Sequence, residues 1–516
     1  MSSRALSAAF LWCRSGIFLR EAVIFIVTAA FFSFWALLGV DFHHDGVMLI
    51  PAIRVAQGQV MFRDIFCQYG ILTPLLQGAA VALFGGEVLV IRFLTVLFYA
   101  GSSVLLDLIW RRFLPRAVSF GVPLMFMLFS ACQMVTFHSW NSVYALFFML
   151  LSGYFVLRFL EDGGIGRLFL AGLSAGLTAA SRTPCGAVTI FAALLTLAAV
   201  NLFSGREKRE IFRENAIYLG GCVSVAAVFL SYIALSGAWD DFIRQNFFYV
   251  FDFVSGRGGG GSWQYFCNSM FPFYQEEYWF CHAFFAVMPL GAMVMLYLSL
   301  RKGILDGAEA MRREMPFIFV LLLGLGSWHQ YYPVPCVRHL FWGGAPLFGA
   351  YLLMLCRLAK RRGAGLVAAV LLSAVLLLGL LPRGIGVAMR WRIGGRVSLD
   401  VPGIRGLLLN RMETDFAKVA LEMNRLPAAI RERGMLNWSE DSLFSVLVKP
   451  AGFRHPQFYR IGHDSPYRDH DAAVMRYITA ERPPVFCDHD VFIPGYVPFA
   501  EAVFGEKHYR LLVPLK

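Results

Sequence analysis

A short stretch near the start of the chain gathers side chains that could move a proton or hold an ion. It reads GVDFHHDGVMLIPAIRVAQGQVMFRDIFCQYG and covers residues 39–70. Its acidic and histidine residues are Asp41, His43, His44, Asp45 and Asp64. A carboxylate can act as a general base toward a hydroxyl group, and carboxylate and imidazole together can bind a divalent cation. Because the stretch directly follows an apolar run, this chemistry would take place beside a membrane.

The composition is that of an integral membrane protein. The chain has 516 residues, of which 58% are hydrophobic and 16% are charged, and its mean hydropathy is +0.60. Soluble domains rarely reach these values. The ten cysteines form no CxxC pair and no Cys/His ligand spacing, so we expect neither a zinc site nor a disulfide framework. No small-residue cleavage site follows the first apolar run, which we expect to be retained as a membrane span.

Eleven segments are apolar enough to be membrane helices, which need about 20 mostly apolar residues. The predicted spans are 21–40, 88–110, 117–135, 141–158, 168–181, 185–203, 215–235, 281–300, 315–332, 339–356 and 364–382. The fifth is short and carries Gly172 and Gly176, a pattern that favours close packing between helices.

The loop charges predict an orientation for these spans. With a cytoplasmic N-terminus, most arginines and lysines of the short loops fall on the cytoplasmic side, as the positive-inside rule requires. This distribution explains much of the net charge of +12 without a nucleic-acid partner. The stretch 39–70 and the tail 383–516 then both lie on the outer face, which in a bacterium is the periplasm.

The chain divides into a membrane domain, residues 1–382, and a tail of soluble composition, residues 383–516. The tail shows an amphipathic helix pattern between Phe416 and Leu426, and a second helix near 470–480 that leads into a strand. We therefore expect a small α/β domain outside the membrane. A lid or stabilising cap is the simpler interpretation of its role, and a dedicated binding module is the alternative.

Two external loops have features of their own. The first, residues 41–87, contains two apolar segments too short or too interrupted to span, and both suit helices lying in the membrane interface. The second, residues 236–280, contains SGRGGGGSWQYF. It could order over a bound lipid or be a plain flexible loop.

The first external loop resembles that of GT-C glycosyltransferases. The resemblance runs over Asp45, PAIRVAQGQVMFRD with Gly58, QYGILTPLLQGAAVALFGG and Arg92, and more loosely over 328–347. These polytopic enzymes, which include bacterial aminoarabinose transferases and protein O-mannosyltransferases, move a sugar from a polyprenyl-phosphate lipid to an acceptor. The chain departs from them in having Asp-Gly, preceded by two histidines, where several relatives have Asp-Glu.

The resemblance implies roles for the acidic residues. Transfer from a phosphate-linked sugar requires a base for the acceptor hydroxyl. We expect Asp45 to be that base, with Asp41 as the second choice or its partner and Asp64 as a further acid of the site. Each could instead cap an interfacial helix or be a solvated loop charge.

The departing lipid phosphate requires positive groups. The arginine fork suits a phosphate, so we expect the donor phosphate to contact basic residues at the outer ends of the spans. The candidates are Arg182, Arg338, His339 and Arg92. The alternative is that the arginines extend into water.

A divalent cation, Mg²⁺ or Mn²⁺, is possible but not required. His43 and His44 are the candidate ligands beside Asp41 and Asp45, although neighbouring histidines in an extended chain point apart. Hydrogen bonding to the protein or to lipid headgroups is the simpler role for both histidines.

The sequence therefore predicts a polytopic α-helical GT-C-like protein with about eleven spans and a small C-terminal α/β periplasmic domain. Its expected function is sugar transfer from a polyprenyl-phosphate donor to a hydroxyl of an envelope glycan, lipid or protein at a bacterial inner membrane. The alternative is a transporter or lipid flippase, which would favour internal repeats and charges near the bilayer midplane. The identity of the sugar and of the acceptor is left open.

Overall fold

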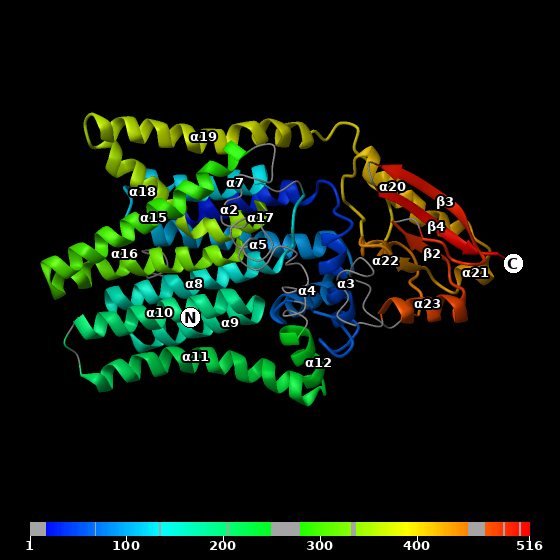
Figure 1. Ribbon diagram of the computed structural model, residues 1–516, viewed down its shortest axis with the longest axis horizontal. Helices are drawn as coiled ribbons and strands as arrows, with labels where there is room; N and C mark the ends of the chain where they lie inside the picture. Colours follow the sequence, from blue (N-terminus) through cyan, green and yellow to red (C-terminus); the bar gives the residue numbers. More distant parts are fainter. Residues whose placement is uncertain are drawn as a thin grey trace, which may run out of the picture.

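The computed structural model describes residues 17–67, 69–133, 136–203, 205, 207–248, 279–331, 337–452, 470–488, 491–504 and 507–515. A bundle of long helices occupies one half of the molecule, and a smaller α/β unit lies beyond one end of it (Figure 1). Helices suit an apolar bilayer because they satisfy their own backbone hydrogen bonds.

Each predicted span corresponds to helix. The bundle consists of α2 (Ile17–Ala36), α5 (Val88–Trp110), α6 (Arg116–Ser119), α7 (Gly121–Gln133), α8 (Asn141–Asp162), α9 (Ile165–Ser181), α10 (Thr183–Phe203), α11 (Lys208–Leu235), α15 (Trp279–Asp306), α16 (Ala308–Ser327), α17 (Val337–Gly344), η4 (Ala345–Leu347), α18 (Phe348–Ala359) and α19 (Ala364–Arg390). Within the described residues, seven helices are both long and apolar enough to cross a membrane. The count of eleven spans therefore stays a prediction.

The small residues of α9 bring it against α11, as the sequence predicts. A Cβ atom added at Gly172 would lie 1.9 Å from the carbonyl oxygen of Tyr218, and one added at Gly221 would lie 2.4 Å from that of Phe169. Neither position can accept a larger residue without moving a backbone. Glycines thus set the distance between these helices, which suits a membrane, where close van der Waals packing drives helix association.

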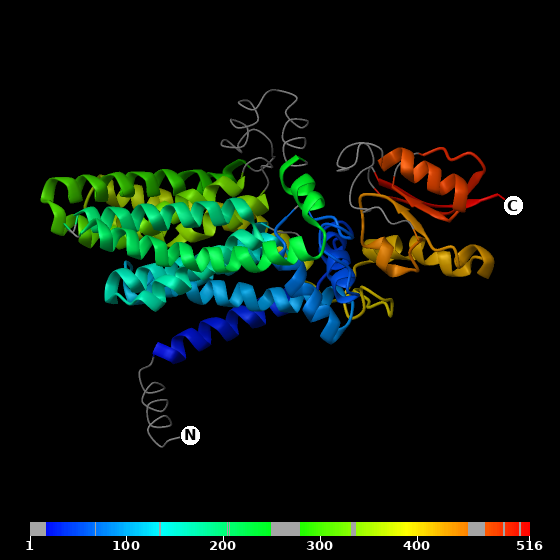
Figure 2. The ribbon, with the colours of Figure 1, turned by 90° about the horizontal axis from the view of Figure 1, so that it is seen from below.

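Two shorter helices lie between the ends of the bundle helices and the α/β unit. They are α3 (His44–Ala56) and α4 (Leu72–Phe84), and both views place them at this junction (Figures 1 and 2). They coincide with the two interfacial helices predicted in the first external loop. The short α12 (Trp239–Ile243) and η1 (Arg244–Phe248) lie at the same end, and most of the glycine-rich loop predicted at 236–280 lies outside the described residues.

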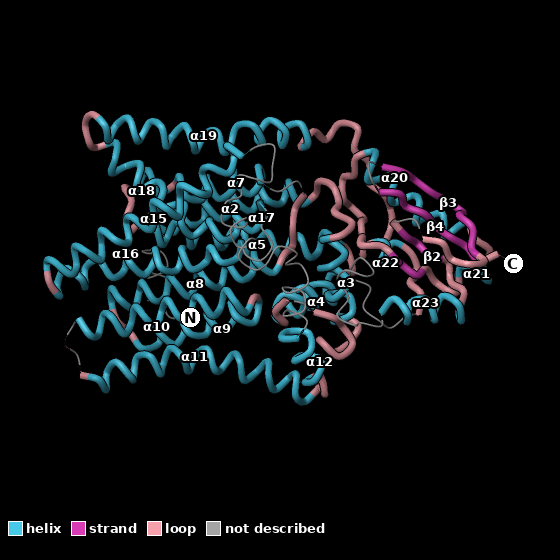
Figure 3. Tube along the Cα trace, in the orientation of Figure 1, coloured by secondary structure: helices cyan, strands magenta, loops and turns pink. Residues whose placement is uncertain are grey.

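The α/β unit contains the four strands of the described chain (Figure 3). They are β1 (Leu436–Trp438), β2 (Val485–Cys487), β3 (Tyr496–Phe504) and β4 (Lys507–Pro514), in the order β1-β2-β4-β3. β1 and β2 are parallel and the other neighbouring pairs are antiparallel. The helices and turns of the unit are α20 (Arg411–Leu421), η5 (Glu422–Arg425), α21 (Ala428–Arg431), α22 (Phe444–Leu447) and α23 (His470–Glu481). The predicted C-terminal α/β unit is thus present.

The junction between bundle and α/β unit is built from backbone and aromatic contacts. α19 continues past the boundary predicted at residue 382 and ends at Arg390. The backbone at Leu38 pairs with that at Leu408, and the ring of Phe42 stacks on that of Phe444 with their centres 4.6 Å apart. Phe42 and Phe444 are both buried. The two parts therefore share an apolar core at the foot of α3.

Candidate active site

The turn from Asp41 to Asp45 folds around its own carboxylates. Asp41 Oδ1 accepts hydrogen bonds from the backbone N–H groups of His43 (3.1 Å) and His44 (2.9 Å). These are backbone groups at the start of α3 that a helix cannot satisfy internally, so Asp41 acts as a cap. Capping fixes one carboxylate oxygen and leaves Oδ2 to face the histidines.

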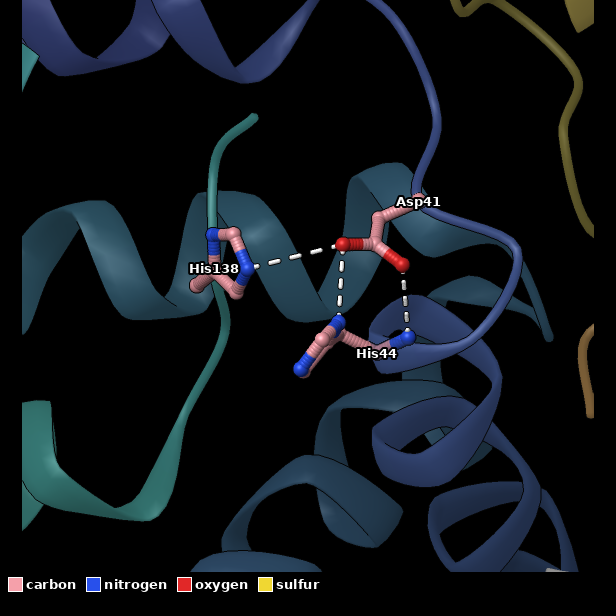
Figure 4. Close-up of side chains that lie close together, drawn as sticks. All are labelled: Asp41, His44 and His138. Atoms are coloured by element: carbon pink, nitrogen blue, oxygen red, sulfur yellow. Dashed lines mark hydrogen bonds and ion pairs between the residues drawn. The ribbon is translucent and has the colours of Figure 1, made fainter. Parts of the chain in front are cut away.

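Two imidazoles approach Asp41 from different parts of the chain (Figure 4). His44 Nδ1 lies 2.8 Å from Asp41 Oδ2, and His138 Nε2 lies 3.6 Å from the same oxygen. His138 belongs to the segment between α7 and α8, whereas His44 begins α3. The side chains of Asp41 and His44 are each 22% exposed, and that of His138 is 3% exposed. The cluster therefore lies below the surface but can still be reached.

Arg338, at the start of α17, completes the cluster. Its Nη1 lies 2.7 Å from His44 Nε2 and 2.8 Å from His138 Nε2. A guanidinium group can only donate, so both Nε2 atoms must accept. His138 Nδ1, 2.6 Å from the carbonyl oxygen of Thr136, then carries the ring proton. Two neutral imidazole lone pairs thus point at one cationic nitrogen.

The ionisation states of His44 and Asp41 agree with these hydrogen bonds. Burial lowers the pKa of His44 to about 3, against the opposing effect of Asp41, so His44 is neutral at physiological pH. Burial alone would raise the pKa of Asp41, but the interactions with His44, whose Nδ1 donates to Oδ2, lower it well below its usual value. The cluster therefore holds one negative carboxylate and one positive guanidinium.

Asp45 lies behind this cluster in a buried ion pair with Arg92. Arg92 Nη2 is 2.6 Å from Asp45 Oδ2, and the two side chains are 0% and 2% exposed. Arg92 also donates to the carbonyl oxygens of Ala36 (2.8 Å) and Gly39 (3.0 Å). Four hydrogen bonds from its guanidinium, which has five N–H groups, thus go to the protein. Neither an acceptor hydroxyl nor a lipid phosphate can reach the pair without exposing it. The roles expected of Asp45 and Arg92 from the sequence stay predictions.

Arg182 occupies a second position near the same end of the bundle. It follows α9 and donates to the hydroxyl group of Ser142 and to Gln330 Oε1, 3.3 Å away. The segment 136–142 connects it to the Asp41 cluster, because this segment carries His138 near one end and Ser142 at the other. Arg182 and Arg338 are thus linked through one short stretch of chain.

The remaining predicted residues are placed differently. Asp64 accepts from the N–H of Val60 (2.8 Å) and pairs with Arg63 (3.0 Å) within its own loop. The ring of His43 contacts that of His44, with ring centres 4.7 Å apart, and its Nδ1 lies 2.5 Å from the carbonyl oxygen of Glu440 in the α/β unit. His339 is half-buried, with its ring 5.8 Å from that of Trp342. Of the two adjacent histidines, only His44 joins Asp41.

Sequence reasoning missed His138, Ser142 and Gln330. Each lies at the outer end of a predicted span, which is the criterion that selected Arg182 and Arg338. A search of those ends for all polar side chains, and not for arginine alone, would have found them. A second acidic group, Glu440, Asp441 and Asp488 in the α/β unit, was also missed; its carboxylate oxygens lie within 4.8 Å of one another.

Comparison with known proteins identifies the fold. The family described as dolichyl-phosphate-mannose-protein mannosyltransferase matches residues 69–234. The oligosaccharyltransferase of Archaeoglobus fulgidus in its apo form superposes with a TM-score of 0.54, at 9% identity, over 91% of this chain and 69% of that chain. This chain has the GT-C glycosyltransferase fold.

Two further structures resemble the GT-C fold of this chain. The Archaeoglobus fulgidus oligosaccharyltransferase AglB, in complex with an inhibitory peptide and a dolichol-phosphate, gives a TM-score of 0.52 at 11% identity, with the same coverage of 91% and 69%. ArnT from Cupriavidus metallidurans, bound to undecaprenyl phosphate, gives 0.47 at 14% identity, over 95% of this chain and 97% of that one. No curated protein sequence matches the chain.

Proposed function

We propose that this protein transfers a sugar from a polyprenyl-phosphate donor to an acceptor hydroxyl at the outer face of a membrane. The observation that carries the proposal is the cluster of Asp41, His44, His138 and Arg338, in which a base and an anion-binding cation lie side by side at the ends of the bundle helices. The similarity to a structure that binds a dolichol-phosphate and to a dolichyl-phosphate-mannose-dependent family supports a lipid-linked donor.

The proposed reaction gives each charged group one role. The acceptor oxygen attacks the anomeric carbon of the sugar as its proton passes to the Asp41 carboxylate. The bond between that carbon and the phosphate oxygen breaks, and the polyprenyl phosphate leaves with the electron pair. Arg338 and Arg182 stabilise the negative charge that develops on the phosphate. Asp41 replaces Asp45 as the proposed base because only Asp41 can be reached.

The location follows from the donor. A polyprenyl chain keeps its phosphate at the membrane interface, so the site must lie at the ends of spans. We infer a bacterial inner membrane, a cytoplasmic N-terminus and a periplasmic α/β domain from the loop charges. The acceptor is then a hydroxyl group of an envelope glycan, lipid or protein.

Binding of undecaprenyl phosphate to the purified protein tests the donor site, with native mass spectrometry as the readout. Loss of a charge-assisted hydrogen bond costs about 1.5–3 kcal/mol, so Arg338→Ala should weaken binding by roughly 10- to 100-fold. Arg338→Lys should recover only part of the affinity, because lysine lacks the bidentate fork. Arg63→Ala, which removes an arginine from the exposed pair with Asp64, is the control. Equal affinity in wild type, Arg338→Ala and Arg63→Ala would refute the donor site.

A divalent cation is a second proposal for the same cluster. Asp41, His44 and His138 offer ligand atoms within 4.8 Å of one another, and the two neutral Nε2 atoms could bind a metal if Arg338 moved to the donor phosphate. Two imidazoles with one carboxylate suit Zn²⁺ better than Mg²⁺. A structure of the Archaeoglobus fulgidus enzyme has been solved with Zn and sulfate.

Metal analysis of the lipid-loaded protein tests this second proposal. We expect about one equivalent of bound metal in the presence of undecaprenyl phosphate. His138→Ala should lower the metal affinity by at least about tenfold, as does removal of a ligand or of a group that orients a ligand. His508→Ala, which removes an exposed histidine paired with Glu501 on the sheet, is the matched control. Metal-free protein that binds and transfers normally would rule the cation out.

A further inference from the structure

The Asp41–Asp45 turn contacts the α/β unit directly, and this contact involves the two residues between Asp41 and His44. We propose that the loop Ser439–Phe444 of the α/β unit positions this turn, and that the α/β unit is in this way part of the catalytic machinery. The inference rests on the proposed function, since it concerns the same Asp41 and His44.

Hydrogen bonds join the loop Ser439–Phe444 to Phe42 and His43, the two residues that follow Asp41. The N–H of Leu443 donates to the carbonyl oxygen of Phe42 (2.9 Å), and the hydroxyl group of Ser442 donates to that of His43 (3.3 Å). In return, His43 Nδ1 lies 2.5 Å from the carbonyl oxygen of Glu440. Two of the three peptide groups that connect Asp41 to His44 are therefore fixed by residues about 400 positions later in the chain.

The loop and the first turn of α3 are in close steric contact. A Cβ atom added at Gly46 would lie 2.1 Å from the backbone nitrogen of Leu443 and 2.5 Å from Ser442 Oγ. The rings of Phe42 and Phe444 are nearly parallel, at 4°. A displacement of the loop must therefore displace the first turn of α3, which carries His44.

The residues before Asp41 are held by the same unit. The backbone at Leu408 exchanges hydrogen bonds with Leu37 (2.8 Å) and Gly39 (3.0 Å). Glu413, whose carboxylate caps α20, also accepts from the N–H of Val40 at 3.3 Å. The α/β unit thus fixes the chain on both sides of Asp41.

The loop is in turn anchored to strand β4. Lys507 Nζ lies 2.9 Å from Asp441 Oδ2 and 2.7 Å from Glu440 Oε1, and the hydroxyl group of Tyr509 donates to the same Asp441 oxygen. Asn437 on β1 donates to the carbonyl oxygen of Asp441 at 3.0 Å. The Asp441 side chain is only 5% exposed, whereas Lys507 is 39% exposed. The bonds to buried Asp441 hold the loop on the sheet, so the loop can transmit the position of the sheet to the turn.

Positioning of this kind has a large effect on catalysis, since a misplacement of about 1 Å can cost about 100-fold in rate. The orientation of Asp41 Oδ2 depends on the N–H groups of His43 and His44, and the position of Arg338 depends on His44. A shift of the loop would therefore alter the base and the phosphate ligand together.

Two pairs of variants test the inference. Gly46→Ala places a methyl group against Leu443 and changes no charged residue; Gly220→Ala, in α11, is the matched control because its Cβ would meet nothing within 4 Å. His43→Ala removes the donor to Glu440, whereas His43→Asn keeps an N–H near the position of Nδ1. If Gly46→Ala does not fold, the comparison of His43→Ala with His43→Asn tests the inference.

Hydrogen–deuterium exchange of the peptide spanning residues 37–47 and the affinity for undecaprenyl phosphate are the two readouts. In Gly46→Ala and His43→Ala we expect exchange to rise by at least about tenfold, as for a local opening that is easier by about 1.4 kcal/mol, and lipid affinity to fall by a similar factor. Gly220→Ala and His43→Asn should stay close to wild type in both readouts, and exchange in α8 should be unchanged in all variants.

The outcomes separate this inference from the proposed function. Unchanged exchange at 37–47 would overturn the inference, as would faster exchange with unchanged lipid affinity, since the loop would then hold the turn without positioning the site. Failure of wild type itself to bind undecaprenyl phosphate would refute the proposed function and the catalytic meaning of the contact together. The exchange data would then still show whether the loop holds the turn.

Discussion

Replacement of Asp41 by asparagine is expected to lower the rate of sugar transfer by about 10²- to 10⁴-fold, the usual contribution of a general base. Asparagine keeps an oxygen that can cap α3, as the carboxylate does toward the N–H groups of His43 and His44. The fold should therefore survive. The measurement is the rate of transfer from the polyprenyl-phosphate sugar that wild type accepts in a donor panel, with thermal unfolding of the same sample.

Two controls make the Asp41 result specific. Asp64→Asn changes an acid of the same external loop that pairs with Arg63, and it should leave the rate within about threefold of wild type, as for most surface changes. Asp45→Asn identifies the base directly. If transfer persists in Asp41→Asn and disappears in a stable Asp45→Asn protein, Asp45 is the base and the present assignment is wrong.

Replacement of Asp45 by alanine should instead destabilise the protein by about 3–5 kcal/mol, because it leaves the buried Arg92 guanidinium without a counter-charge. The pair is almost fully buried, and Asp45 also accepts from the N–H of Asp41 at 2.9 Å. Thermal unfolding in detergent can be followed with a thiol-reactive dye, since Cys67, Cys185, Cys222 and Cys487 are buried.

The exposed pair of Arg63 and Asp64 provides the comparison for this stability measurement. Its side chains are 48% and 34% exposed, so loss of Asp64 should produce no resolved change in unfolding temperature. A double variant, Asp45→Leu with Arg92→Met, should recover part of the stability lost in Asp45→Ala, because it removes the unpaired charge. Recovery should be incomplete, since the carbonyl oxygens of Ala36 and Gly39 lose their donor. An Asp45→Ala protein as stable as wild type would contradict the structural role.

Hydropathy and loop charge were sufficient to predict the helical bundle, the two short helices of the first loop and the α/β unit. Arg338 was selected because it lies beside the start of a predicted span, whereas Asp41 and His44 were selected as an acid and a candidate metal ligand of the stretch that follows the first span. The spacing of Asp41 and Asp45 could not predict which of the two carboxylates is accessible from solvent. Accessibility depends on the side chain that packs against each carboxylate. Asp45 faces Arg92 from α5, and Asp41 faces His138 from the segment before α8.

Other features depend on contacts that local sequence does not encode. Arg92 lies near the start of a predicted span, where an arginine reaching toward water is the ordinary expectation, yet it is fully buried. The bond between His43 and Glu440 joins residues 397 positions apart. A single sequence contains no signal for such a pair, so the role of the tail could not be predicted from it.

The anchoring of the Asp41 turn by β4 has a consequence for biosynthesis. The turn is made among the first residues of the described chain, whereas Lys507 and Tyr509, which hold the loop against it, are made after every helix of the bundle. A chain whose synthesis or export stops before β4 can insert all its helices and still lack the anchor for its acidic turn. On the proposed function, such products would occupy the membrane without transferring sugar, and transfer would depend on synthesis of β4.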